Sequence, residues 1–204
     1  MDPKELFIFY NKYIKPIYSE IEARSNSLPI ELLFETYSSF DHLKRYYIDY
    51  PDNDKNQQKE IEKAMSHLQR GVLDAFKLKL KYFNDDLEQL LKTNIDFSLI
   101  EEGKYLPKLL SGKKEIIDLA KQARLDERNE DKNIAFNTWL QVSLLINSFE
   151  DKFFNEEKID WAKHQTSKIR NTDRFFNFWS GVLSGILASV IFAIISYLIK
   201  IWQF

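Results

Sequence analysis

The amino-acid sequence predicts an all-α protein, in which a helical bundle is followed by a single C-terminal transmembrane helix. Apolar residues recur at steps of three and four, and no segment of any length alternates polar and apolar residues with period two. Residues 175–199 contain no Asp, Glu, Lys, Arg or His. The chain has only 5 glycines and no cysteine, which leaves little material for a phosphate-binding loop and excludes a disulfide framework.

The first two helices are predicted from their end signals. Asp2 to Glu5 has the D-x-x-E form of a capping box, so a helix is expected over residues 3–24, bent at Pro16. After a break, the second helix is expected over residues 29–50.

The third helix is the longest, over residues 56–93, and its apolar positions form one buried stripe. These positions are Ile61, Ala64, Met65, Leu68, Val72, Leu73, Phe76, Leu80, Phe83, Leu87, Leu90 and Leu91.

The remaining part of the bundle is predicted as more broken. A short helix can start at residues 94–96, and Gly103, Pro107 and Gly112 are expected to interrupt the chain before a helix over residues 115–127. Another helix is expected after residue 132. From residue 156 no Gly or Pro appears before Gly181, so one helix is expected to continue from the bundle into the membrane.

The apolar run at residues 175–199 predicts the membrane anchor. A helix rising about 1.5 Å per residue makes this run on the order of 37 Å long, enough to cross a hydrocarbon core of roughly 30 Å. We therefore divide the chain into a cytoplasmic helical bundle, residues 1–170, and a transmembrane helix, residues 171–204. No secretory signal follows the N-terminus, and basic residues precede the run whereas only Lys200 follows it. The positive-inside rule then predicts a single-pass protein of the cytoplasmic (inner) membrane with its N-terminal body in the cytoplasm.

One side of the predicted anchor carries small residues. Gly181-x-x-x-Gly185 is the small-xxx-small pattern that allows close approach of helices in lipid, and we expect the anchor to make a homo-oligomer within the lipid bilayer. Whether such an oligomer encloses an aqueous pore or only holds neighbours together stays open. The predicted association face consists of Gly181, Ser184, Gly185, Ala188, Ser189, Phe192 and Ser196.

A polar motif occurs twice, once on each of the second and third predicted helices. H-L-x-R-x-x-x-D places histidine, arginine and aspartate on one helical face, with arginine and aspartate four residues apart. If the helices are antiparallel neighbours, the two sets can meet as a ligand or RNA-end site; the alternative is an intrahelical salt bridge beside an interface histidine. The motif residues are His42, Arg45, Asp49, His67, Arg70 and Asp74.

Residues 62–77, E-K-A-M-S-H-L-Q-R-G-V-L-D-A-F-K, together with the paired long helices around them, resemble helical-bundle domains of the HEPN type. This resemblance covers roughly residues 28–94 and implies a role in prokaryotic anti-phage defence. Ribonucleases of that group carry R-x-x-x-x-H, whereas here the fifth residue after Arg45 is Tyr50 and the fifth after Arg70 is Ala75. None of the arginines in the chain is followed by a histidine at that spacing.

The order of bundle and anchor resembles membrane-associated effectors of bacterial defence. We therefore expect a non-enzymatic effector or accessory protein that oligomerises through its transmembrane helix and perturbs the membrane, in response to a protein, RNA or nucleotide signal. A tail-anchored adaptor and a membrane-tethered HEPN-like ribonuclease are the alternatives. No cofactor or metal is expected, and 29 basic against 31 acidic residues do not give the basic balance typical of sequence-independent nucleic-acid binding.

Overall fold

The computed structural model describes the backbone of residues 1–129 and 131–202, and side chains within these ranges except at residues 132, 193–194 and 196–202. The structure is 88% helical, with no strand among the described residues, which confirms the all-α class. Its contacts separate two compact units, Met1–Thr93 with Lys108–Phe154, and Asn94–Pro107 with Asn155–Phe204. The proposed division at residue 170 concerns the membrane boundary and stays a prediction.

The first predicted helix is present, with its distortion just before Pro16. Asp2 caps α1 (Pro3–Phe9) by accepting a hydrogen bond from the backbone N–H of Lys4 at 2.9 Å. A π-helical turn, η1 (Tyr10–Ile14), then leads into α2 (Lys15–Ser25). Because proline removes a backbone donor and crowds the preceding turn, a wider turn ahead of Pro16 keeps the chain helical. Asn26 then ends α2 in a left-handed conformation, with φ of 53°.

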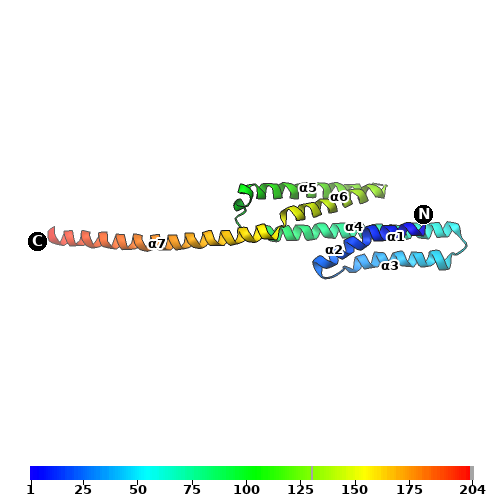
Figure 1. Cartoon of the computed structure of the whole chain (residues 1–204), viewed down its shortest axis with the longest axis horizontal. Coiled ribbons are helices and arrows are strands. Elements are labelled where there is room, and N and C mark those ends of the chain that lie inside the picture. Colours follow the sequence, from blue (N-terminus) through cyan, green and yellow to red (C-terminus); the bar gives the residue numbers. More distant parts are fainter. Residues whose placement is uncertain (130, 203–204) are drawn as a thin grey trace. The chain divides into compact units, whose positions relative to one another are not determined.

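The next two helices pack side by side in antiparallel directions (Figure 1). The first of them, α3 (Ile30–Lys44), continues into a second π-helical turn, η2 (Arg45–Asp49), and α4 (Asp54–Lys92) follows. Most of the stripe predicted for α4 is buried, including Ile61, Ala64, Val72, Phe83 and Leu87 at 0% exposure. Leu73, Leu80, Leu90 and Leu91 are half-buried instead.

The fifth helix begins earlier than the sequence predicts. The expected interruptions at Pro107 and Gly112 are wrong, because α5 runs from Tyr105 to Asp126 through both residues. Pro107 falls in the first turn, where a helix does not need the missing N–H. At Gly112 an added Cβ would lie 2.9 Å from the Phe149 ring, so glycine there allows α5 to pack closely on α6 (Lys132–Phe153). Neither residue therefore interrupts α5.

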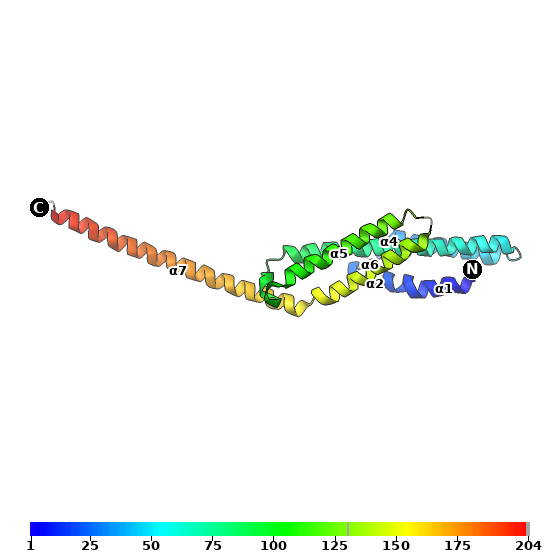
Figure 2. The ribbon, with the colours of Figure 1, turned by 90° about the horizontal axis from the view of Figure 1, so that it is seen from above.

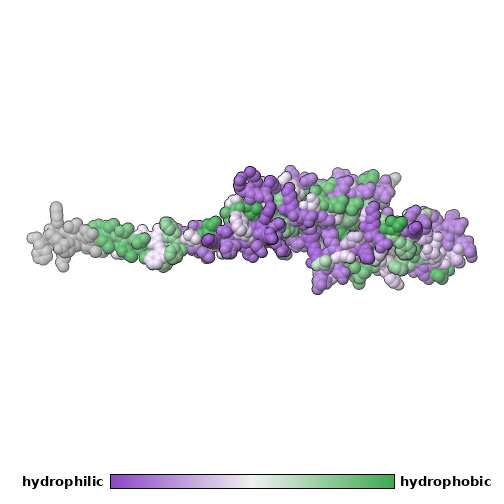
Figure 3. All heavy atoms as spheres, in the orientation of Figure 1, coloured by the Kyte–Doolittle hydropathy of each residue, from purple (hydrophilic) through white to green (hydrophobic). Residues whose placement is uncertain are grey.

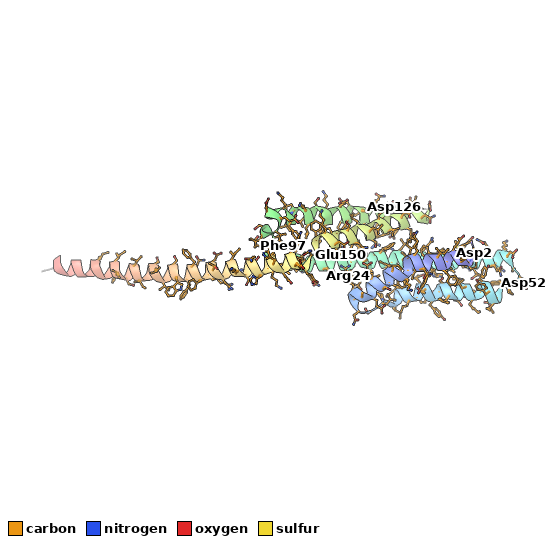
Figure 4. All side chains as sticks on the ribbon, in the orientation of Figure 1. Asp2, Arg24, Asp52, Phe97, Asp126 and Glu150 are labelled. Atoms are coloured by element: carbon orange, nitrogen blue, oxygen red, sulfur yellow. The ribbon has the colours of Figure 1, made fainter. Side chains whose placement is uncertain are left out.

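Two polar clusters join α2, α4 and α6 across the core. In the first, the Lys79 ammonium donates to Glu20 Oε1 at 2.6 Å and to Asn147 Oδ1, although Lys79 lies among the apolar residues of α4 and its side chain is only 1% exposed. In the second, Arg24 Nη2 donates to Asp86 and to Glu150, each at 2.6 Å. Arg24 and Glu150 are labelled in Figure 4. Charges that are removed from water need such partners, so the two clusters set how these three helices align.

The second compact unit consists of two short turns and a long helix. The turns are η3 (Phe97–Leu99) and η4 (Glu101–Gly103), and α7 follows later in the chain from Glu156 to Trp202. The backbone N–H of Asp96 donates to the Thr166 hydroxyl at 2.9 Å, which fixes the turns to α7. The prediction of one uninterrupted helix from residue 156 is confirmed (Figure 2).

Candidate functional site

The two motif histidines meet between α3 and α4. The imidazole rings of His42 and His67 stack with their centroids 5.2 Å apart and an angle of 23° between the ring planes. Each ring is held by a glutamate from the opposite helix: His42 Nδ1 lies 2.6 Å from Glu60 Oε2, and His67 Nδ1 lies 2.7 Å from Glu35 Oε2. An ionised carboxylate can only accept, so this geometry assigns the proton of each neutral ring to Nδ1 and leaves Nε2 as the acceptor.

The arrangement is nearly symmetric because both helices carry a glutamate seven residues before the histidine. Glu35 precedes His42 on α3, and Glu60 precedes His67 on α4. Seven residues are about two helical turns, so each glutamate shares a face with its own histidine and reaches the histidine of the antiparallel neighbour. We call Glu35, His42, Glu60 and His67 the His–Glu cluster.

The glutamates of the His–Glu cluster are shielded from solvent, and two basic side chains lie at the edge of the cluster. The exposed fractions of the Glu60 and Glu35 side chains are 7% and 14%. Lys63 donates to the second oxygen of Glu60 at 2.7 Å, and Arg70 Nη1 lies 3.9 Å from Glu35 Oε1. Each carboxylate therefore has a histidine on one side and a basic residue on the other, and of the two basic residues Lys63 is within hydrogen-bond distance.

The expected arginine–aspartate contacts are replaced by others. Arg45 pairs with Asp41 at 2.6 Å, and Asp49 pairs with Lys44 at 2.9 Å. The cause is the π-helical turn η2, which aligns residues five apart and so brings Asp49 under Lys44 instead of Arg45. On α4, Asp74 pairs with Lys77 at 3.3 Å.

The glutamates of the cluster were not predicted as site residues. Their signal was present in the sequence as E-x-x-x-x-x-x-H-L-x-R-x-x-x-D, the longer form of the repeat, which occurs at Glu35 and again at Glu60. Buried acid–base pairs of this kind can bind a polar ligand or transfer a proton. Among the residues that the structure describes, no group of three or more His, Cys, Asp or Glu side chains could hold a metal ion.

Glu60 has a perturbed pKa. Burial alone would raise the pKa of its carboxyl group, but hydrogen bonds from Lys63 and His42 outweigh burial and hold the pKa below its usual value. A lowered folded-state pKa stabilises the fold above the unfolded-state pKa, which is about 4.3. This stabilisation is lost as the pH falls through the folded-state pKa of Glu60.

We therefore expect wild-type protein and a Glu60→Gln variant to converge in stability at acid pH. The melting temperature of the wild type should fall more steeply than that of Glu60→Gln below pH 4.5, because only the wild type must protonate this carboxylate. Circular dichroism melts of the two proteins at a series of pH values measure the difference. Parallel pH profiles of the two proteins would show that Glu60 does not supply this stability.

The other candidate site is the apolar part of α7. The described structure has one helix long and apolar enough to cross a membrane; an 18-residue stretch of it has a mean hydropathy of 1.7 and is 0% buried. Figure 3 shows the change from polar to apolar side chains along this helix. The large apolar residues from Phe175 to Phe192 are exposed except Val182, which is half-buried, and a Cβ added at Gly181 or Gly185 would meet nothing within 4 Å. The part of the small-residue face from Gly181 to Phe192 is thus uncovered by the described chain.

The serines of this face differ in their present bonding. The Ser189 hydroxyl donates to the carbonyl of Gly185 at 2.9 Å, so its proton is used within its own helix. Ser184, Ala188 and Phe192 are exposed. The prediction for the Ser196 side chain lies outside the described residues. Comparison of the chain with known protein families, curated proteins and solved structures finds no match.

Proposed function

We propose that this chain is a single-pass membrane protein that associates through α7 and perturbs the bilayer, as an effector or accessory protein of a prokaryotic defence system. One observation carries the membrane part of the proposal: the apolar part of α7 up to Phe192 is covered by no other part of the described chain. An exposed apolar surface of this length is very unfavourable in water, and a lipid hydrocarbon core satisfies it, because a helix bonds all its own backbone groups.

The charges around the apolar segment support a cytoplasmic body. Lys163, Lys168 and Arg174 are exposed on the polar part of α7, and Arg170 donates to Asn94 at 2.6 Å. Basic residues beside a transmembrane helix are retained on the cytoplasmic side. We therefore propose the inner membrane as the location, with the bundle in the cytoplasm.

The small-residue face supports association of the anchors. Gly181 and Gly185 lie one helical turn apart and present open backbone. Helix pairs in lipid gain stability from close packing at such positions, since there is no hydrophobic driving force between helices there.

The proposed role in defence is supported by a different observation, which is the resemblance of residues 28–94 to HEPN-type bundles. The adaptor and ribonuclease alternatives stay predictions.

We expect a Gly181→Leu, Gly185→Leu double variant to lose the self-association that α7 makes in the membrane. Leucine at both positions blocks close approach, and loss of about 1.4 kcal/mol of association energy lowers the association constant roughly tenfold. Crosslinking of the full chain in membranes measures the oligomer. Leu183→Ile with Leu187→Ile is the matched control, since these residues lie on the opposite side of α7 and keep its hydropathy. Crosslinks between α7 helices that persist in the glycine variant contradict association through this face.

The effector function is tested by the membrane potential of cells that express the full chain. We expect a potential-sensitive dye to report depolarisation with wild-type protein and with the leucine-to-isoleucine control, but not with the glycine double variant. An unchanged potential with membrane-inserted wild-type protein, also in cells infected with phage, contradicts the effector function and favours the adaptor.

A further inference from the structure

The outer face of α3 and η2 is apolar and uncovered. Leu32 and Leu43 point into the bundle and are 2% and 7% exposed, as expected for the inner side of a helix. On the outer side, seven large apolar residues at steps of three, four and seven are 50–75% exposed. A helix packed on one side ordinarily carries polar residues on the other. The residues of this outer face are Ile30, Leu33, Phe34, Tyr37, Phe40, Tyr47 and Ile48.

A hollow lies at one edge of the outer face, where α1 meets α3. Its volume is about 190 Å³, and its lining includes Phe7 of α1, Tyr10 of η1, Phe40 of α3 and Leu68 of α4. Phe7 and Phe40 are also 49% and 64% exposed, so they form a rim that extends the apolar surface beyond α3. A hollow of this size fits one protruding side chain better than the smooth surface of a bilayer.

We propose that the outer face of α3 binds the same face of a second copy of the chain. The seven side chains leave on the order of 800 Å² of apolar surface exposed, from about 200 Å² for each large side chain. This equals the area that each partner contributes to a stable standard-size interface, and it exceeds the largest apolar patch of a typical monomer. One helix face can supply this area to a symmetric dimer without a second element.

The charges on the edge of the outer face are self-complementary in an antiparallel dimer. In a two-fold dimer the same surface meets itself, and the midpoint of the face, between Ile30 and Ile48, lies at Ser39. An axis at this level places Glu31 of one copy at the level of Tyr47 of the other, two residues or about 3 Å along the helix from Arg45, so the long arginine side chain can reach the glutamate, twice. Arg45 is 43% exposed in its pair with Asp41, so it can bind a second carboxylate. In a parallel pair, each charged residue would instead lie beside the same residue of the second copy, so opposite charges would not meet.

The polar residues within the face fit the same arrangement. Asp41 and Lys44 lie in the apolar stripe at helical spacing, and a hydrocarbon core would penalise both charges. With the axis near Ser39, Asp41 lies opposite Tyr37 of the second copy, whose hydroxyl can donate to it. Lys44 lies opposite Phe34 of the second copy, where an ammonium group is attracted to the aromatic ring. A second copy therefore accommodates both charges, and a lipid surface does not.

This dimer adds to the association of α7 and does not depend on it. A two-fold contact is closed and stops at two copies, whereas a second contact through α7 can link one dimer to the next. Two separate interfaces on one chain give assemblies larger than either interface alone. The α3 contact would set the unit from which a membrane assembly grows.

The experiment compares Tyr37→Glu with Leu144→Glu in the full chain. Leu144 on α6 is 59% exposed and lies outside the face, so it is the matched control for adding a charge to an exposed apolar position. Both are made in the Gly181→Leu, Gly185→Leu background, and light scattering in detergent gives the mass. We expect the background protein and Leu144→Glu to be dimers, and Tyr37→Glu to dissociate at least about tenfold more readily. A monomeric background protein, or an equal mass for Tyr37→Glu, overturns the proposal whatever α7 does.

A charge exchange tests the antiparallel arrangement. Glu31→Arg alone and Arg45→Glu alone should each weaken the dimer, because each places like charges together across the interface. Combining the two changes in one chain restores opposite charges and should restore the dimer to within about threefold. Dimers weakened equally by the single and double changes would overturn the two-fold contact, since an unrelated partner gains nothing from the exchange.

Discussion

Replacing Glu20 by alanine is expected to lower the free energy of unfolding of the bundle by about 3 kcal/mol. The reason is Lys79, whose ammonium group stays in the core with a side chain that is 1% exposed and, among the described residues, keeps Asn147 as its one remaining partner. Breaking a buried ion pair from one side leaves an uncompensated charge, which costs more than the pair itself contributes. Thermal unfolding of the detergent-solubilised full chain, followed by far-UV circular dichroism, should show a melting temperature lower by roughly 6–12 °C.

The complementary change, Lys79→Met, distinguishes a buried charge from a lost contact. Methionine fills a similar volume, and Glu20 is 35% exposed, so its carboxylate can turn to solvent. We expect a change within about 1 kcal/mol, because no charge remains buried. If Lys79→Met destabilises the protein as much as Glu20→Ala, the ion pair itself, and not the unpaired lysine, contributes the stability.

Most of the helices could be predicted because their signals are local. The period of apolar residues defines α4, and the absence of charge defines the apolar part of α7 within one segment of chain. The start of α5 could not be predicted, because residues such as Pro107 and Gly112 either interrupt a helix or are accommodated within one. Only the packing of Phe149 on Gly112 shows that this glycine serves a close helix contact.

The candidate site was predictable in part for a similar reason. The helical spacing of the repeated motif indicated that His42 and His67 could face each other across two helices, and in the structure their rings stack. Their partners depend on antiparallel register across two helices, so Glu35 and Glu60 were missed although both stand seven residues before a histidine. The Arg45–Asp49 contact failed because a π-helical turn changes the spacing that the prediction assumed.

The burial of Lys79 could not be predicted from the sequence. By spacing alone it lies among the apolar positions of α4, next to the half-buried Leu80, and a lysine there is expected to extend to solvent. Its partners are 59 and 68 residues away in the sequence, on α2 and α6. No local pattern carries that information, because it depends on how three helices align.

Replacing Trp139 by alanine is expected to cost about 4 kcal/mol, the largest stability change that we predict for a single residue. Trp139 is 0% exposed, and its indole N–H donates to Glu127 Oε1 at 2.7 Å. The Arg124 guanidinium lies 5.3 Å from the ring centroid, so the side chain joins α6 to the end of α5 through apolar, hydrogen-bonding and cation–π contacts. Truncation leaves a cavity and also removes one of the donors to Glu127, whose Oε1 lies 3.3 Å from Lys77 Nζ as well.

Two further variants separate these contributions. Trp139→Phe keeps much of the packing but loses the N–H, and should cost about 1–2 kcal/mol. Trp161→Ala is the matched control, because Trp161 is 52% exposed on α7 and its loss should change stability by no more than about 0.5 kcal/mol. Equal melting temperatures for Trp139→Ala and Trp161→Ala would mean that α5 and α6 do not depend on this side chain. A loss with Trp139→Phe as large as with alanine would instead assign the stability to the hydrogen bond with Glu127.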